Sequence, residues 1–183
     1  GVVLKEGEGC TISVQEAARF FSDSDQTKTV RQFNGRWVLG EPSYQAQVNN
    51  TNYILLADAL AAAATSTSDG TTVKLLRDIS LAETLVINGG TFTFDLNGHK
   101  IQIGGRDIYL IKITDGIVTI CDSQETGAIG NGSWGGALIV DGVTANVTIE
   151  SGTFWGVSNY YAVGLRNGKV TIKNGTFQGK EKS

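Results

Sequence analysis

Thr93-Phe94-Asp95-Leu96-Asn97-Gly98 is one copy of a short phrase that recurs along the chain. Three later copies are Val118-Thr119-Ile120-Cys121-Asp122-Ser123, Val147-Thr148-Ile149-Glu150-Ser151-Gly152 and Val170-Thr171-Ile172-Lys173-Asn174-Gly175, and Val73 to Asp78 is an earlier, looser one. Each alternates apolar and polar residues, as a half-buried strand does, and then enters a turn. Counted from Val73, Phe94, Val118, Val147 and Val170, the steps are 21, 24, 29 and 23 residues. A period in the twenties with a strand in each unit is typical of stacked coils.

The repeat predicts an all-β fold, in which residues 71–177 form a right-handed parallel β-helix of about five coils. Further strands are expected at 85–87, 109–113, 137–140 and 161–165, one in each unit. Six Asn-Gly steps supply turns, because both residues tolerate positive φ. Such turns also suit hairpins, so an antiparallel sandwich is the alternative fold.

The sequence divides into three parts: a small α+β lead-in over 1–45, a capping helix within 46–70, and the β-helix over 71–183. In the lead-in, Ser13-Val14-Gln15-Glu16 is a capping box that predicts a short helix, and residues 30–39 predict a hairpin with a type I′ turn at Asn34-Gly35. A second helix is expected from Tyr53 to about Ala64, with Thr51 or Asn52 as its N-cap. It should cover the exposed apolar end of the first coil.

Composition narrows the function classes. The 183 residues carry a net charge of −3, so the sequence lacks the basic footprint of a nucleic-acid-binding or anionic-membrane-binding protein. No stretch reaches the roughly 20 apolar residues that span a bilayer. The sequence has no Met and no signal peptide, so we expect a processed or excised piece of a longer chain. Cys10 and Cys121 allow one disulfide, but we expect free thiols.

The residues from Tyr53 through Ala57-Asp58-Ala59-Leu60, Thr72 to Ile79 and Phe94 to Ile101 carry a family resemblance. They resemble the opening of right-handed parallel β-helix domains of the pectin-lyase-like superfold in bacterial cell-surface and adhesin-like proteins. The Val-Thr-Ile-x-x-Gly-Thr-Phe units at Val147 and Val170 are similar to later coils of that family. The resemblance covers residues 53–177 and implies adhesion or glycan binding, with some polysaccharide-cleaving relatives.

Catalysis by such a domain would need carboxylates gathered on one face beside a Lys or Arg. The candidates are Asp95, Asp115, Asp122 and Asp141. Aligning Phe94 with Val118 places Asp95 level with Thr119 and Asp122 three positions later, so even this pair matches poorly. We therefore favour a structural role, in which these acids accept hydrogen bonds from turn amides.

The sequence gives little support for a metal site or a phosphate-binding loop. His99 is the only histidine and is interpreted as a surface turn residue, so no metal site and no cofactor are predicted. The glycine-rich stretch from Gly130 to Gly136 lacks a following Lys-Ser/Thr and is interpreted as a long turn rather than a phosphate cradle.

Aromatic residues give the binding hypothesis. Phe92, Phe94, Phe154 and Phe177 fit stacking inside the coils, and Tyr161 shares their phase. Trp134, Trp155 and Tyr160 do not share it, and they are the candidate ligand-binding residues, as a shelf for sugar rings or as local packing over the coil edge.

The expected function is a secreted or cell-surface bacterial module for adhesion or for binding a glycan or a host surface protein, without catalysis. Other domains of a longer parent chain are further expected partners, whereas nucleic acid and membrane insertion are not expected. A polysaccharide lyase or glycoside hydrolase acting on acidic polysaccharides is the first alternative, and a structural spacer is the second.

Overall fold

The computed structural model describes residues 3–5, 13, 30–40, 43–103, 108–130, 134–157 and 160–180. The chain forms two compact units, residues 1–44 and 45–183. The helix expected after the capping box at Ser13, and Cys10, lie outside the described residues.

The first unit contains a three-stranded antiparallel sheet. Its strands are β1 (Val3–Lys5), β2 (Val30–Phe33) and β3 (Arg36–Leu39), in the order β1-β3-β2. Asn34 and Gly35 have φ angles of 51° and 72°, and β2 pairs with β3 from Phe33↔Arg36 outward. Both central residues therefore have the positive φ of a type I′ turn, which confirms the predicted hairpin.

The second unit is a parallel β-solenoid of about four turns, close to the five coils predicted. Its one long sheet is made of twelve strands. They are β4 (Ala46–Val48), β5 (Thr51–Tyr53), β6 (Thr72–Leu75), β7 (Ile79–Leu81), β8 (Leu85–Asp95), β9 (Lys100–Ile103), β10 (Tyr109–Cys121), β11 (Ala128–Ile129), β12 (Gly136–Ile149), β13 (Thr153–Val157), β14 (Val163–Ile172) and β15 (Thr176–Lys180).

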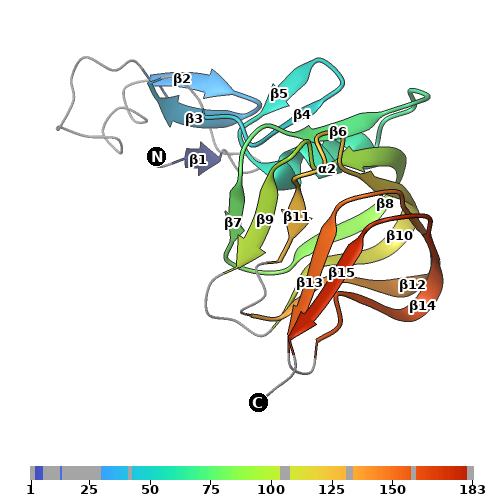
Figure 1. Ribbon diagram of the computed structural model, residues 1–183. Coiled ribbons are helices and arrows are strands. Elements are labelled where there is room, and N and C mark those ends of the chain that lie inside the picture. Colours follow the sequence, from blue (N-terminus) through green and yellow to red (C-terminus); the bar gives the residue numbers. More distant parts are fainter. Residues whose placement is uncertain are drawn as a thin grey trace. The chain divides into compact units, whose positions relative to one another are not determined.

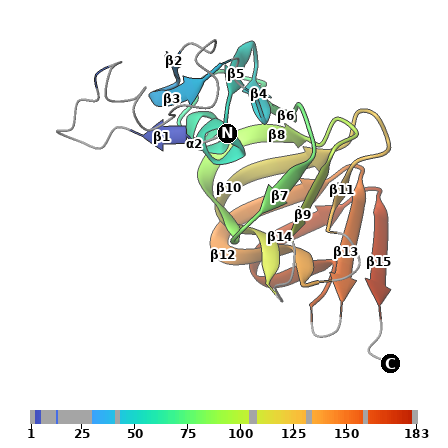
Figure 2. The same ribbon diagram turned by 90° about the vertical axis from the view of Figure 1, so that its left-hand side faces the viewer.

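The strands stack in parallel columns (Figures 1 and 2). One column runs β7, β9, β11, β13, β15, which lie side by side in Figure 2. The long strands β8, β10, β12 and β14 bend in the middle and supply two columns, with register shifts at each bend. Consecutive phrases therefore pair in parallel, which excludes the antiparallel sandwich.

Inward side chains form one continuous core. Val73, Phe94, Ile120 and Ile149 occupy equivalent positions of successive coils and are fully buried. Because each coil buries its apolar face only against its neighbours, this column is what holds the stack together.

The register corrects one sequence alignment. Val118 pairs with Phe92, not with Phe94, and Phe94 pairs with Ile120. The copy of the repeat that was counted from Phe94 thus begins two residues earlier, at Phe92. Apolar alternation could not reveal the error, because a shift of two residues leaves every inward side chain inward.

The helix α2 spans Leu56–Ala64, so the predicted start at Tyr53 and the predicted cap at Thr51 or Asn52 are wrong. Thr51 to Tyr53 instead form β5, which pairs antiparallel with β4, and β4 pairs antiparallel with β6. The N-cap residue Leu55 has no side-chain capping bond. The orphan N–H of Leu56 donates to the Gln45 side-chain oxygen at 2.9 Å, a cap eleven residues distant that no local motif predicts.

The expected covering role of this helix is confirmed. Leu56, Ala59, Leu60 and Ala63 are buried and share one apolar cluster with the first coil's strands. Gly90 in β8 has a φ of 87°, and a Cβ there would lie 2.5 Å from the Ala64 Cα. The close approach of helix and strand thus requires glycine.

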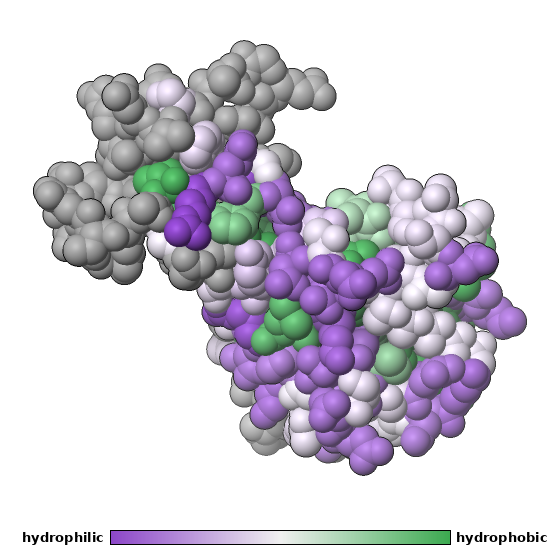
Figure 3. All heavy atoms as spheres, turned by 90° about the horizontal axis from the view of Figure 1, so that it is seen from above, coloured by the Kyte–Doolittle hydropathy of each residue, from purple (hydrophilic) through white to green (hydrophobic). Residues whose placement is uncertain are grey.

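One outer face of the protein, seen from above in Figure 3, differs from this core. On the face seen from above, most coloured residues are hydrophilic or intermediate, and the apolar ones form separate patches (Figure 3). This face gives no continuous apolar area.

Candidate functional site

A groove of about 640 Å³ lies beside the start of β14. Its described lining residues come from three successive coils: Tyr109, Ile139, Tyr160, Tyr161, Val163, Gly164, Leu165 and Arg166. Ile139 pairs with Lys112 on one side and with Gly164 on the other, so it lies on the outward face of the column. The groove is therefore on the side of the solenoid, not in its core.

Tyr109 is held across two neighbouring coils. A Cβ at Gly136 would lie 2.6 Å from the Tyr109 Cε1, and one at Gly164 would lie 2.9 Å from its hydroxyl oxygen. The glycines in the next two coils thus make room for the ring to lie flat over the strands. The Tyr161 N–H donates to the Tyr109 hydroxyl at 3.4 Å.

Two further rings complete the aromatic part. Tyr160 packs edge-on against Tyr109, with centroids 5.2 Å apart and planes at 70°. Tyr161 is 73% exposed, so its predicted interior position is wrong. The physical reason is that β14 begins only at Val163, and Tyr161 lies ahead of the strand alternation.

A charged cluster borders the groove at Arg166. Asp141 Oδ2 lies 2.9 Å from Lys112 Nζ and 3.6 Å from the Arg166 guanidinium, while Asn167 donates to Asp141 Oδ1 at 3.1 Å. These groups come from three coils. The hydrogen bond from Lys112, followed by that from Asn167, lowers the pKa of Asp141 below its ordinary value.

The three predicted binding residues have different positions. Tyr160 lines the groove, whereas neither tryptophan is among the lining residues. Trp134 is 44% exposed, and Trp155 is half-buried in β13, opposite Gln178 of β15. Ring contacts join Phe33 to Tyr44, Tyr109 to Tyr160 and Phe154 to Phe177, and in the described part of the chain none joins Trp134 to Trp155.

Asp95, the last residue of β8, and Asp122, the first residue after β10, are both buried. Asp95 Oδ1 accepts the N–H groups of Asn97 at 2.8 Å and Ser123 at 2.9 Å. Asp122 accepts Gly98 N–H at 2.6 Å and Gly127 N–H at 2.5 Å. Backbone N–H groups of two coils donate to these carboxylate oxygens. The geometry therefore supports the role favoured from the sequence, in which the acids accept hydrogen bonds from turn amides.

The other two acids lie elsewhere. Asp115 follows the first half of β10, and its pKa is lowered by hydrogen bonds from the Thr144 side chain and the Gly116 amide. Asp141 belongs to the cluster beside the groove. The four predicted acids thus serve different local structures.

His99 has one acidic neighbour that sequence reasoning missed. Its Nδ1 lies 3.3 Å from Asp78 Oδ1, and the Lys100 N–H donates to the same oxygen at 3.0 Å. That amide is the main reason why the pKa of Asp78 is lowered. The described residues hold no cluster of three or more His, Cys, Asp or Glu arranged to bind a metal ion.

Cys121 is a free, half-buried thiol. Burial, followed by the charge of Asp95, raises its pKa to about 11. Its thiolate is therefore scarce at neutral pH, which makes it a poor nucleophile.

Sequence reasoning missed Tyr109, Ile139 and Arg166 as groove residues. The sequence contains one signal for this site, because Gly136 and Gly164 interrupt the apolar runs of two adjacent strands next to Tyr109. Recognising that these glycines face the tyrosine requires the correct strand register.

Comparison with protein-family models, curated proteins and solved structures gives no match. Within the described part of the chain, no helix combines the length and apolarity that a membrane crossing requires.

Proposed function

We propose that residues 45–183 form a non-catalytic module of a secreted or cell-surface bacterial protein that binds a carboxylate-bearing glycan in the groove beside β14. One observation carries the proposal: three tyrosines and Arg166 line an open groove on the coil surface. Concave sites with aromatic walls and a few polar groups are the usual form of ligand sites.

The aromatic part suits a sugar ring. Tyr161 presents an exposed ring, while Tyr109 is fixed by Gly136, Gly164 and the Tyr160 contact. Rings held by packing lose little conformational freedom when a ligand stacks on them, so binding costs less entropy.

The charge of the surrounding coil favours an acidic ligand. Residues 160–180 contain Arg166, Lys169, Lys173 and Lys180 and no Asp or Glu. Arg166 is exposed and lies 3.6 Å from Asp141, a long contact that leaves guanidinium N–H groups for a carboxylate. The resemblance of residues 53–177 to bacterial cell-surface β-helix domains supports the location and the ligand class.

Calorimetric titration with oligogalacturonate and with a neutral malto-oligosaccharide tests this function. Oligogalacturonate should bind, Tyr161→Ala and Arg166→Ala should each weaken binding about tenfold, and the neutral sugar should bind less. Trp134→Ala is the matched control, because this exposed ring does not line the groove.

Two results would change the conclusion. Loss of binding in Trp134→Ala but not in Tyr161→Ala would move the site to the predicted tryptophan shelf. Absence of binding to either sugar would leave the spacer hypothesis as the better one.

A further inference from the structure

Asp141 meets two cations at one carboxylate oxygen, and the two contacts differ in kind. Lys112 Nζ lies 2.9 Å from Asp141 Oδ2, which is a hydrogen-bond distance, whereas the Arg166 guanidinium lies 3.6 Å from the same oxygen, which is too long for one. Asn167 donates to the other oxygen, Oδ1, at 3.1 Å. Asp141 is thus bound mainly by Lys112 and Asn167, and Arg166 is its weakest partner.

The exposure of the three charged side chains follows the same order. The side chain of Asp141 is 17% exposed, that of Lys112 is 36% exposed and that of Arg166 is 68% exposed. The hydrogen bond from Lys112 is also the largest cause of the lowered pKa of Asp141, and the charge of Arg166 is the smallest. Lys112 and Asp141 therefore form a half-buried pair, beside which Arg166 extends into solvent.

Lys112 is not among the residues that line the groove. It is the register partner of Ile139, which does line it, and of Val86 in the coil before. The strand β10, which carries Lys112, lies between β8 and β12, and β12, which carries Asp141, lies between β10 and β14. Lys112 thus reaches Asp141 from the preceding coil, and Arg166 reaches it from the following coil.

The balance of charge in this cluster decides how much of the Arg166 charge a ligand meets. Two cations share one anion, so the cluster keeps one net positive charge, and Arg166 is the member that lines the groove. In the described part of the chain, Arg166 pairs with no acid other than Asp141. Without Lys112, one anion would face one cation, and Asp141 would neutralise Arg166. A paired arginine attracts a ligand carboxylate less strongly, because the two carboxylates repel each other and compete for it.

We propose that Lys112 determines the preference of the groove for acidic ligands, because it binds Asp141 and so prevents that carboxylate from neutralising Arg166. The inference rests on the proposed glycan site and names the residues that set its charge selectivity. Arg166 contacts the ligand carboxylate and Asp141 competes with that carboxylate. Lys112 is a positioning residue, which acts on the ligand only through Asp141.

Calorimetric titration of three variants with oligogalacturonate tests these roles. Lys112→Met removes the charge and keeps a long aliphatic side chain next to Ile139, so the affinity should fall about threefold. Asp141→Asn removes the competing charge, so the affinity should rise about threefold. The double variant Lys112→Met/Asp141→Asn should bind at least as tightly as wild type, because Lys112 has no carboxylate to bind once Asp141 is replaced.

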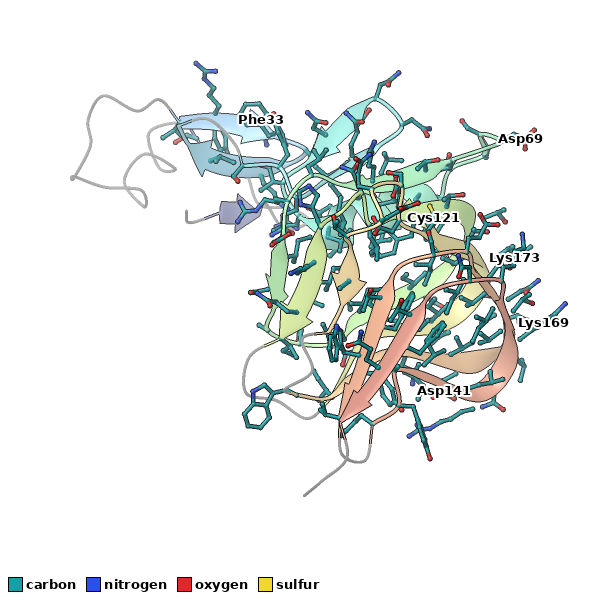
Figure 4. All side chains as sticks on the ribbon, in the orientation of Figure 1. Phe33, Asp69, Cys121, Asp141, Lys169 and Lys173 are labelled. Carbon is teal, nitrogen blue, oxygen red and sulfur yellow. The ribbon has the colours of Figure 1, made fainter. Side chains whose placement is uncertain are left out.

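Four controls separate this effect from a general loss of charge or of folding. Lys112→Arg keeps the cation and should retain wild-type affinity. Lys169→Met removes a positive charge from the part of β14 beyond the bend, where Lys169 projects outward (Figure 4), and should leave the affinity unchanged. Fully methyl-esterified oligogalacturonate has the same backbone without the charges, and its affinity should be equal for all variants. Urea unfolding verifies that each variant is folded.

Three results would overturn the proposal. Unchanged affinity in Lys112→Met would show that Lys112 does not affect the ligand. If the double variant bound as weakly as Lys112→Met, Lys112 would contact the ligand itself. If Asp141→Asn bound more weakly than wild type, Asp141 would orient Arg166 instead of competing with the ligand.

The same titrations distinguish failure of this inference from failure of the glycan site. In each of the three cases above, binding to wild type that Tyr161→Ala weakens would leave the glycan groove in place. Absence of oligogalacturonate binding to wild type would refute the groove and this inference together.

Discussion

Asp122 allows the sharpest test of how the coils are joined. The residue is 4% exposed, and its carboxylate accepts Gly98 N–H at 2.6 Å and Gly127 N–H at 2.5 Å, with a longer bond of 3.4 Å from Gln124 N–H. Its own N–H donates to Ser151 Oγ at 2.7 Å. One residue thus ties together the turns of three successive coils.

Asp122→Ala removes the acceptor and leaves the Gly98 and Gly127 amides without a partner. A hydrogen bond to a charged group contributes about 1.5–3 kcal/mol, so losing the two short ones should lower the free energy of unfolding by about 3–6 kcal/mol. Asp122→Asn keeps one oxygen acceptor but places an NH₂ group against the other backbone amide. We therefore expect it to lower the free energy of unfolding as well, but by less than Asp122→Ala does.

Urea unfolding followed by far-ultraviolet circular dichroism measures the change. Asp69→Ala is the control, since Asp69 is exposed at a turn (Figure 4) and the same atoms are removed there. If Asp122→Ala costs no more than about 1 kcal/mol, as expected for an exposed acid, the carboxylate does not hold the turns and the argument fails.

Three other predictions concern different parts of the second unit. Leu60→Asp in α2 should uncover the first coil and produce oligomers on size-exclusion chromatography, whereas Ala61→Asp, on the exposed side of the same helix, should leave a monomer unchanged. In a Cys10→Ser background, Cys121 should react with a thiol reagent at pH 8 about 100-fold more slowly than after unfolding in urea, since its pKa is raised from 9.0 to about 11; equal rates would contradict the burial of the thiol. Because the pKa of Asp141 is lowered in the folded protein, its contribution to stability is present above the ordinary Asp pKa and lost as the pH falls through the lowered value; the difference in urea midpoint between wild type and Asp141→Asn should therefore be greatest near neutral pH and vanish in acid.

The solenoid could be predicted from the repeat because each copy shows the same alternation of apolar and polar residues within a few positions. Every copy of the phrase states the same alternation, and the stacking of Val73, Phe94, Ile120 and Ile149 needs only that alternation. The cap of α2 was not predictable in this way. It depends on Gln45, eleven residues away from the amide that it satisfies, and on a β4–β5 pair whose strands are only three residues long.

The groove was missed for a related reason. Its residues lie in three coils, so finding it requires knowing which residues are neighbours across the stack. A register error of two residues preserved the core but moved Asp95 from the end of its strand to its middle. That same error hid the fact that Asp95 and Asp122 serve neighbouring turns, because the alignment placed them three positions apart.

Position in the stack, rather than residue type, decides what an inward side chain does in this protein. Ile149 and Ile172 occupy equivalent positions in the same column, yet the first is fully buried and the second is 53% exposed. Alternation assigns both to the core, because it contains no information about which coil is covered by a neighbour. The same logic applies to charge, because Asp141 is paired with Lys112 of the preceding coil and Arg166 of the following coil.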